Sequence, residues 1–197
     1  MKGLILVAHP DDETIWMGGT ILKYRDWDWT IISLCRKEDP DRKPKFMKVC
    51  NYYKAACVIS DLDDKELKPL PINYIESKIR AIIPENSYDY IFTHGDNGEY
   101  GHMRHKEIHQ AVKKLIKKKL IKCRKIFTFS YLLSKRNVPN TPNLKIPEPN
   151  KNSDKHIRLS EQIFKKKANL VKSMYGFPSK SFEVLSCNKT EAFKILT

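Results

Sequence analysis

The order of segments along the chain predicts an α/β protein, a Rossmann-like three-layer sandwich around a mostly parallel sheet. Short apolar, β-branched segments recur along the sequence, and segments of ten or more residues with helical apolar spacing separate them. Strands that alternate with helices of this length form βαβ units, which place helices on both faces of a parallel sheet. No G-x-G-x-x-G motif follows the first apolar segment, so the dinucleotide fingerprint is not expected.

Strands are predicted where short runs of Leu, Ile, Val, Tyr and Phe end at polar or turn-forming residues. The first run stops at a His, a Pro and three acidic residues, and the fourth stops at a glycine-rich polar stretch. The predicted strands are residues 2–8, 29–35, 58–59, 88–93, 125–131 and 156–159.

Helices are predicted where apolar residues recur at three- and four-residue spacing. The predicted helices are residues 14–26, 45–57, 72–83, 102–121 and 161–175, the last with Ser160 as its N-cap. Residues 134–153 are rich in proline and asparagine, and they are predicted to form a long irregular loop that serves as a flap over the site. The pattern of the residues from 176 onward is ambiguous.

Length and composition indicate one folded, soluble domain over residues 1–197. The chain is 41% hydrophobic and 30% charged, which supplies a core and a hydrated surface. The apolar runs are too short to span a membrane, and acidic residues follow the first of them at once, so no span or signal peptide is predicted and a cytoplasmic location is expected. Five scattered cysteines without a C-x-x-C pair indicate reduced thiols.

The net charge of +14 indicates an anionic partner or a strongly hydrated surface. Residues 106–125 contain nine Lys or Arg and one Glu, interleaved with apolar residues at helical spacing. The simplest interpretation is the solvated face of an amphipathic helix. A nucleic-acid-binding helix is the alternative, but exposed aromatic residues do not interleave with its lysines, so nucleic acid is not the expected partner.

Polar side chains follow two strong predicted strands, at residues 9–13 and 94–105. The carboxyl ends of strands in an open α/β sheet border the ligand crevice, so we expect these two stretches to form one site. Hydrolytic zinc takes three His or carboxylate ligands and leaves a fourth position for water. His9 and Asp12 can point the same way across a proline-containing turn. Three histidines follow along one face of a predicted helix: His102, His105 and His109.

Other interpretations of these residues stay open. A single His near a helix start usually packs or caps, and only the joint occurrence of imidazoles and acids at two strand ends favours a metal. His105 and His109 form an H-x-x-x-H pair that could bind a metal, although the Glu of a zincin is not at the second position. Asp11 and Asp12 could hold magnesium for phosphoryl transfer, but a site with two histidines favours zinc or another transition metal.

Two motifs together resemble the signature pair of the LmbE-like family, the zinc-dependent N-acetylglucosaminyl deacetylases related to PIG-L. They are Ala8-His9-Pro10-Asp11-Asp12-Glu13 and Gly98-Glu99-Tyr100-Gly101-His102-Met103-Arg104-His105. The resemblance implies a hydrolase that removes the N-acetyl group from a sugar conjugate containing N-acetylglucosamine, with one Zn²⁺ per chain; Fe²⁺ or Co²⁺ would suit the same ligands. A phosphate-bearing substrate would suit the positive charge. A hydrolase of another amide is the remaining alternative.

The resemblance also implies roles for individual residues. The implied metal ligands are His9, Asp12 and His105. Asp11 is implied to be the general base on the attacking water, and Tyr100 and His102 to stabilise the tetrahedral oxyanion or protonate the leaving amine. The implied sugar contacts are Lys45, where relatives have an arginine, and Asp64.

Two positions depart from the family pattern. Relatives often have an aspartate where this chain has Arg104, and a cation there would disfavour a charged His102. Lys45 keeps the charge of the arginine found in relatives but lacks its planar fork.

Overall fold

The computed structural model describes residues 1–66 and 68–196. A seven-stranded sheet crosses its centre in the order β3-β2-β1-β4-β5-β9-β8. The strands are β1 (Lys2–Val7), β2 (Asp28–Ser33), β3 (Ala56–Ile59), β4 (Ser87–Thr93), β5 (Lys122–Phe129), β8 (Lys155–Arg158) and β9 (Thr190–Leu196). The first five run parallel, whereas β9 pairs antiparallel with β5 and β8 pairs antiparallel with β9. The predicted mostly parallel α/β sheet is therefore confirmed.

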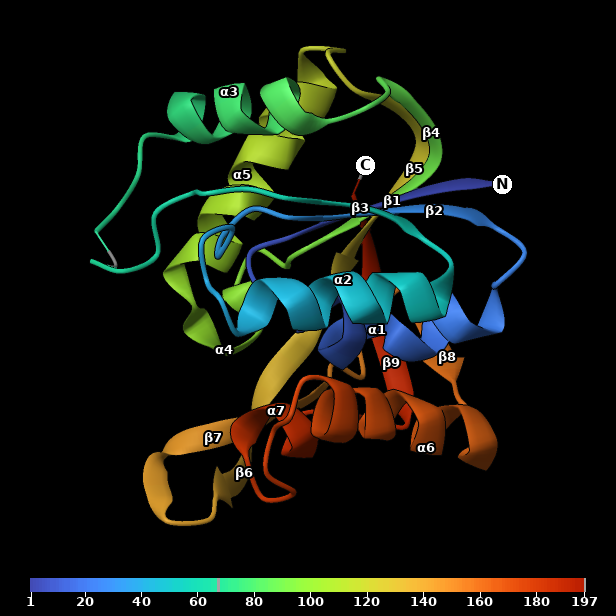
Figure 1. The fold of residues 1–197 in the computed structure, drawn as a ribbon, viewed down its shortest axis with the longest axis vertical. Coiled ribbons are helices and arrows are strands. Elements are labelled where there is room, and N and C mark those ends of the chain that lie inside the picture. Colours follow the sequence, from blue (N-terminus) through green and yellow to red (C-terminus); the bar gives the residue numbers. More distant parts are fainter. Residues whose placement is uncertain (67, 197) are drawn as a thin grey trace.

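Helices cover both faces of the sheet (Figure 1). One face carries α1 (Asp12–Lys23), α2 (Arg42–Tyr53), α6 (Glu161–Asn169) and the π-helical turn Leu170–Met174, and the other carries α3 (Ile72–Ile82) and α5 (Met103–Lys117). Side chains alternate along β1, so Ile5 and Val7 join one buried cluster and Leu4 and Leu6 join the other. Two short helices are α4 (Gly98–Gly101) and α7 (Phe182–Leu185).

Strand β1 lies between β2 and β4, where the order of the strands reverses. Leu6 pairs with Thr93 on one side, and Val7 pairs with Ser33 on the other. Chain connections leave a sheet in opposite directions at such a point, which opens a crevice beside the carboxyl ends of the strands. The polar stretches that follow β1 and β4 both begin at this crevice, as the sequence predicts.

Helix α5 has the predicted amphipathic character. Its buried side includes Ile108, Val112 and Leu115, which pack in the same cluster as residues of α3, and Lys113 and Lys114 are exposed. The lysines therefore lie on the solvated face. No helix in the described part of the chain combines the length and apolar character that crossing a bilayer requires.

Residues 134–153 do not form the predicted irregular flap. Most of them belong to a hairpin of β6 (Tyr131–Val138) and β7 (Thr141–Pro149), which projects from the body of the protein at the lower left of Figure 1. Each strand of a two-stranded ribbon keeps one unpaired edge, which tolerates proline. Asn140 turns the chain with a φ of 63°, a conformation that asparagine adopts more readily than most residues. Proline and asparagine thus mark a turn and free edges here.

The C-terminal segment forms helix and strand. Ser160 caps α6, as predicted, because its Oγ accepts the N–H of Ile163 at 3.3 Å. The predicted helix over residues 161–175 becomes π-helical after Asn169. The ambiguous tail contains α7 and β9.

A buried carboxylate from β9 holds an interrupted helix. Helix α1 breaks at Met17, where φ is −145° and ψ is 15°. Glu191 accepts the N–H groups of Gly19 at 2.8 Å and Thr20 at 2.7 Å. It also pairs with Lys167 at 2.7 Å, and neither of these two side chains is exposed. Glu191 therefore satisfies amides near the break and fixes the helix whose first residue is Asp12.

Candidate active site

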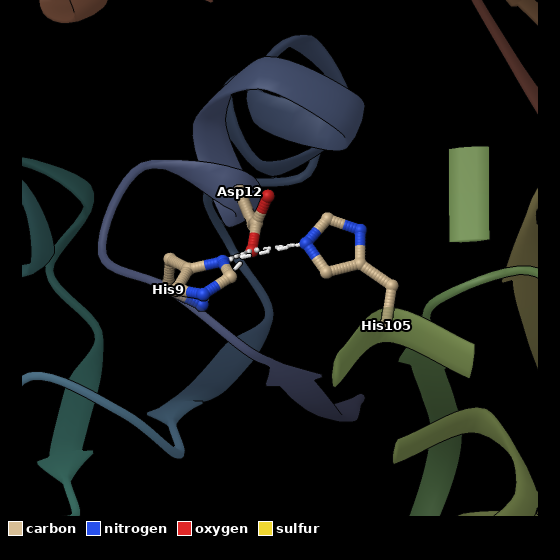
Figure 2. Close-up of side chains that lie close together, drawn as sticks. All are labelled: His9, Asp12 and His105. Atoms are coloured by element: carbon tan, nitrogen blue, oxygen red, sulfur yellow. Dashed lines mark hydrogen bonds and ion pairs between the residues drawn. The ribbon is translucent and has the colours of Figure 1, made fainter. Parts of the chain in front are cut away.

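Three potential metal ligands converge beside the carboxyl end of β1 (Figure 2). His9 Nδ1 and His105 Nε2 each lie 3.3 Å from Asp12 Oδ2, and the two nitrogens lie 3.3 Å apart. Three ligands of a tetrahedral zinc ion with bonds of about 2.0–2.1 Å are spaced by about 3.3 Å. The nearly equilateral arrangement of two imidazoles and one carboxylate therefore fits zinc in both ligand type and spacing.

The three groups also stabilise one another electrostatically. Burial alone would raise the pKa of Asp12, but His105, His9 and His94 outweigh it and hold that pKa well below its usual value. Burial likewise opposes the charge of His105, yet Asp12 and Glu99 raise its pKa to about 10. Trp16 Nε1 donates to Asp12 Oδ1 at 2.9 Å, which leaves Oδ2 for the histidines. Asp12 is thus ionised and oriented.

Asp11 lies in a strained turn between these ligands. Its φ of 115° is unusual for a residue with a side chain, and such strain costs on the order of 1–3 kcal/mol. Its N–H donates to Glu13 Oε2 at 3.0 Å, and Glu13 Oε1 accepts the hydroxyls of Thr14 at 2.6 Å and Tyr175 at 2.7 Å. Glu13, which burial gives a pKa of about 7, therefore holds the turn that presents Asp11.

A pocket of about 230 Å³ opens over the cluster. Its walls combine charged, imidazole and aromatic side chains; they include His9, Asp11, Asp12, Trp16, Arg36, Arg42, Asp64, Tyr100, His102, Phe182 and Glu183. His105 is fully buried beside them. The structure thus brings seven of the eight predicted site residues to one place, and the eighth is Lys45.

Lys45 is not among the residues that line the pocket, whereas Arg42 is. Lys45 Nζ pairs with Asp41 at 2.6 Å, whereas Arg42 Nη1 lies 3.1 Å from Asp11 Oδ2. The sugar contact that the resemblance implies for Lys45 stays a prediction, and Arg42 is a further cation that lines the pocket. Helix α2 begins at Arg42, three residues earlier than predicted, and Asp39 Oδ1 accepts the N–H of Arg42 at 2.9 Å. Pro44 lies in the first turn of α2, where a proline is well tolerated. Asp39, followed by Pro44 a few residues later, is the sequence signal that indicates the earlier start of the helix.

His102 and Tyr100 lie at the pocket as uncharged groups. Burial, followed by the neighbouring His105 and His9, lowers the pKa of His102 to about 4. Its Nδ1 atom is buried and has no hydrogen-bond partner among the described residues. Burial, followed by Asp12, raises the pKa of the Tyr100 phenol, which therefore keeps its proton at neutral pH.

Arg104 binds away from His102. Its fully buried guanidinium donates to Glu107 at 2.5 Å and to the backbone oxygens of Asp63 at 2.5 Å and Lys68 at 2.9 Å. The expectation that this cation faces His102 is not met. Arg104 instead ties the loop that follows β3 to α5.

Sequence reasoning missed two residues of the buried surroundings, His94 and Glu99. Glu99 Oε2 lies 2.5 Å from His105 Nδ1 and 2.9 Å from His94 Nδ1. His109 Nδ1 lies 2.9 Å from the backbone oxygen of His94, so His109 supports the loop after β4 and lies outside the potential metal-ligand groups of the described residues. The H-x-x-x-H alternative is not supported. The sequence signal for His94 and Glu99 was the polar run after β4, which predicted only a loop.

Comparison with known proteins identifies a family for this chain. Residues 4–116 match the family model described as PIG-L, GlcNAc-PI de-N-acetylase, and this segment includes all three potential ligands. A protein of Acanthamoeba polyphaga mimivirus, described as uncharacterized, is 24% identical over 120 residues. That match covers 53% of this chain and 53% of the viral protein, so the chain spans about half the length of the curated relative it matches.

Solved structures share the fold. A deacetylase of the teicoplanin biosynthesis pathway, in complex with teicoplanin, has a TM-score of 0.62 at 12% identity and covers 89% of this chain and 87% of its own. The A40926 pseudoaglycone deacetylase has a TM-score of 0.59 at 13% identity and covers 88% and 81%. The likenesses support the fold, and the family match extends over more than half of the 197 residues. The chain therefore belongs to the PIG-L family.

Proposed function

We propose that this protein is a zinc-dependent hydrolase that removes the N-acetyl group from a sugar conjugate containing N-acetylglucosamine. The observation that carries the proposal is the 3.3 Å triangle of His9, Asp12 and His105 beside the pocket. Imidazole nitrogens suit zinc, iron or cobalt, whereas magnesium prefers oxygen ligands throughout. Family membership supports deacetylation.

The three ligand residues would hold one ion per chain. When bound, zinc polarises a carbonyl and brings the pKa of water towards neutrality. Asp11 then takes the proton from the water that attacks the acetyl carbonyl. Burial, followed by Asp12, raises the pKa of Asp11 well above its usual value, which brings this carboxylate closer to the working pH of a general base.

Tyr100 and His102 would stabilise the tetrahedral oxyanion. Both are neutral at pH 7 and line the pocket, so each can donate a hydrogen bond to the oxygen on which negative charge develops. The low pKa of His102 favours this role over that of a proton donor to the amine. Asp11, which holds the proton taken from water, passes it to the leaving nitrogen, and acetate and a free amine result.

The pocket walls support a sugar conjugate as the substrate. A second pocket of about 500 Å³ shares Arg36 and Asp64 with the first and offers space for the remainder of the conjugate. Asp64 Oδ1 is buried without a partner among the described residues, so it can accept a sugar hydroxyl. Arg36 and Arg42 would suit a phosphate-bearing substrate.

The test is to incubate zinc-loaded protein with N-acetylglucosamine conjugates, with and without phosphate, and to measure released acetate and free amine. Other N-acyl amides serve as further arms. We expect acetate release, and we expect Asp11→Asn to lower kcat by about 10²–10⁴-fold while it still binds zinc stoichiometrically. Zinc-loaded protein that cleaves no amide would refute the proposal.

A further inference from the structure

We propose that Glu99 and Asp64 are positioning residues that each fix the orientation and tautomer of one metal-binding histidine. Glu99 holds His105, and Asp64 holds His9. The inference rests on the proposed function, because it concerns the same metal cluster. Asp64 would thus orient His9 through Oδ2, while its Oδ1 stays available for the substrate. Glu99 would orient His105, although it does not line the pocket.

Glu99 receives hydrogen bonds on both carboxylate oxygens. Oε2 accepts from His105 Nδ1 at 2.5 Å, and Oε1 accepts the N–H of Gly95 at 2.6 Å. His94 is a further donor: its Nε2 accepts the N–H of Ala8 at 2.9 Å, so the proton of a neutral His94 lies on Nδ1, 2.9 Å from Oε2. Glu99 has a φ of 58°, a conformation held here by these contacts. The carboxylate is therefore locked in place beside His105.

Asp64 holds the other histidine from the opposite loop, after β3. Its side chain is 6% exposed, and Oδ2 lies 3.0 Å from His9 Nε2 and 2.9 Å from Arg36 Nη2. Because the guanidinium of Arg36 is always protonated, it stabilises Asp64 as a carboxylate, and the proton shared with His9 lies on the imidazole. The Arg104 guanidinium holds this loop through the adjacent backbone oxygen of Asp63 at 2.5 Å.

These two contacts determine which nitrogens remain free for a metal. A metal displaces one proton from an imidazolium, and because the N–H bound to a carboxylate keeps its proton, the lone pair that binds the metal lies on the opposite nitrogen. His105 thus presents Nε2 and His9 presents Nδ1. These are the two atoms that lie 3.3 Å from Asp12 Oδ2. The carboxylate contacts also prevent the rings from rotating and increase their basicity as ligands.

The first test measures zinc affinity by competition with a chromogenic chelator, using the full chain without substrate. We expect Glu99→Gln and Asp64→Asn each to weaken zinc binding by about 10–100-fold. Asp96→Asn and Asp61→Asn are matched controls: both residues are exposed, lie three positions before Glu99 and Asp64 in the sequence, and undergo the same loss of charge. They should bind zinc as tightly as the wild type. Unchanged affinity in both Glu99→Gln and Asp64→Asn would overturn the inference.

The second test reads the tautomers directly from long-range ¹H–¹⁵N spectra of zinc-loaded protein with ¹⁵N-labelled histidine. We expect the metal-bound nitrogens to be Nδ1 of His9 and Nε2 of His105. Asp64→Asn should perturb the remaining N–H of His9 alone, and Glu99→Gln that of His105 alone, which a general loss of folding would not do. The wild-type spectrum suffices if a variant does not fold, and binding through the opposite nitrogen of either ring would contradict the inference.

The outcomes separate this inference from the proposed function. Wild-type protein that binds zinc with the expected tautomers but cleaves no amide would refute the function and leave the positioning roles intact. An active deacetylase whose zinc affinity is unaffected by both substitutions would refute the positioning roles alone. Wild-type protein that binds no zinc would refute both.

Discussion

Arg42 Nη1 lies 3.1 Å from Asp11 Oδ2, so a cation at the start of α2 faces the carboxylate that we propose as the general base. The guanidinium also lies 4.2 Å from the centre of the Phe177 ring, which holds it in this direction. Asp11 lies in the turn that follows β1, and Arg42 lies at the start of α2, the helix that follows β2. The ion pair thus links a cation of the pocket wall to the turn that contains Asp11.

Substitution of Arg42 tests this pairing. We expect Arg42→Met to lower kcat/KM by about 10–100-fold, because a hydrogen bond to a charged group contributes about 1.5–3 kcal/mol. Lys45→Met removes the same charge from the same helix but from a side chain that binds Asp41, and its kcat/KM should stay near the wild-type value. A larger loss in Lys45→Met than in Arg42→Met would favour Lys45, the contact that the family resemblance implies.

Metal content distinguishes the two histidines of α5. His105→Gln should lose most of the bound zinc, because it removes one corner of the ligand triangle. His109→Gln should keep stoichiometric zinc, since the hydrogen bond of His109 goes to the backbone oxygen of His94 in the loop after β4. Elemental analysis of dialysed protein makes the comparison. Zinc lost by both variants would mean that the H-x-x-x-H pair binds the metal, and zinc retained by His105→Gln would contradict the ligand triangle.

The buried Lys167–Glu191 pair should contribute strongly to stability. Lys167→Met leaves Glu191 buried without its cation, and we expect the free energy of unfolding to fall by about 3–5 kcal/mol. The control is Lys189→Met, which breaks an exposed pair with Glu161 and should change the free energy of unfolding far less, because solvent screens the pair. Urea denaturation followed by circular dichroism measures both. Equal losses would show that burial of the first pair is energetically unimportant.

Cys57 should react with alkylating agents at lower pH than an ordinary thiol. The neighbouring Cys50 thiol lowers the pKa of Cys57 to about 7, and a lower pKa means that the reactive thiolate is already populated near neutrality. The rate of iodoacetamide labelling, followed by mass spectrometry, should therefore reach half its maximum near pH 7. Cys50→Ala should move this midpoint upwards. Cys123, whose pKa burial raises, is an internal control that should label only at higher pH.

The ligand cluster was predictable because its residues adjoin strand ends. His9 and Asp12 directly follow β1, and the alternation of strands and helices was enough to predict a parallel sheet with a crevice at that edge. The strand ends left His102, His105 and His109 open, and the resemblance to the LmbE-like family selected His105; the pairing of β1 with β4 confirms that the two strands are neighbours. The roles of the site residues in catalysis stay predictions, as do the single domain and the cytoplasmic location.

The remaining features depend on contacts between distant segments. Glu99 was hidden because its partners are two imidazoles and a backbone amide, which no spacing rule joins to it. The position of Arg42 at the start of α2 was missed because Pro44 was taken to precede the helix. The hairpin was mistaken for a loop because proline and asparagine counts do not distinguish an irregular loop from a ribbon with free edges. Tertiary packing decides each of these cases.

The contact between Glu191 and α1 has a consequence for the order in which the chain acquires its structure. Glu191 follows Asp12 by almost the whole length of the chain, so a ribosome-bound chain already contains all three metal ligands well before β9 emerges. Until then, the amides of Gly19 and Thr20 lack their carboxylate partner. Zinc capture by stalled nascent chains should therefore become tight only after residue 191 has left the ribosomal tunnel, which would make metal binding depend on the docking of β9.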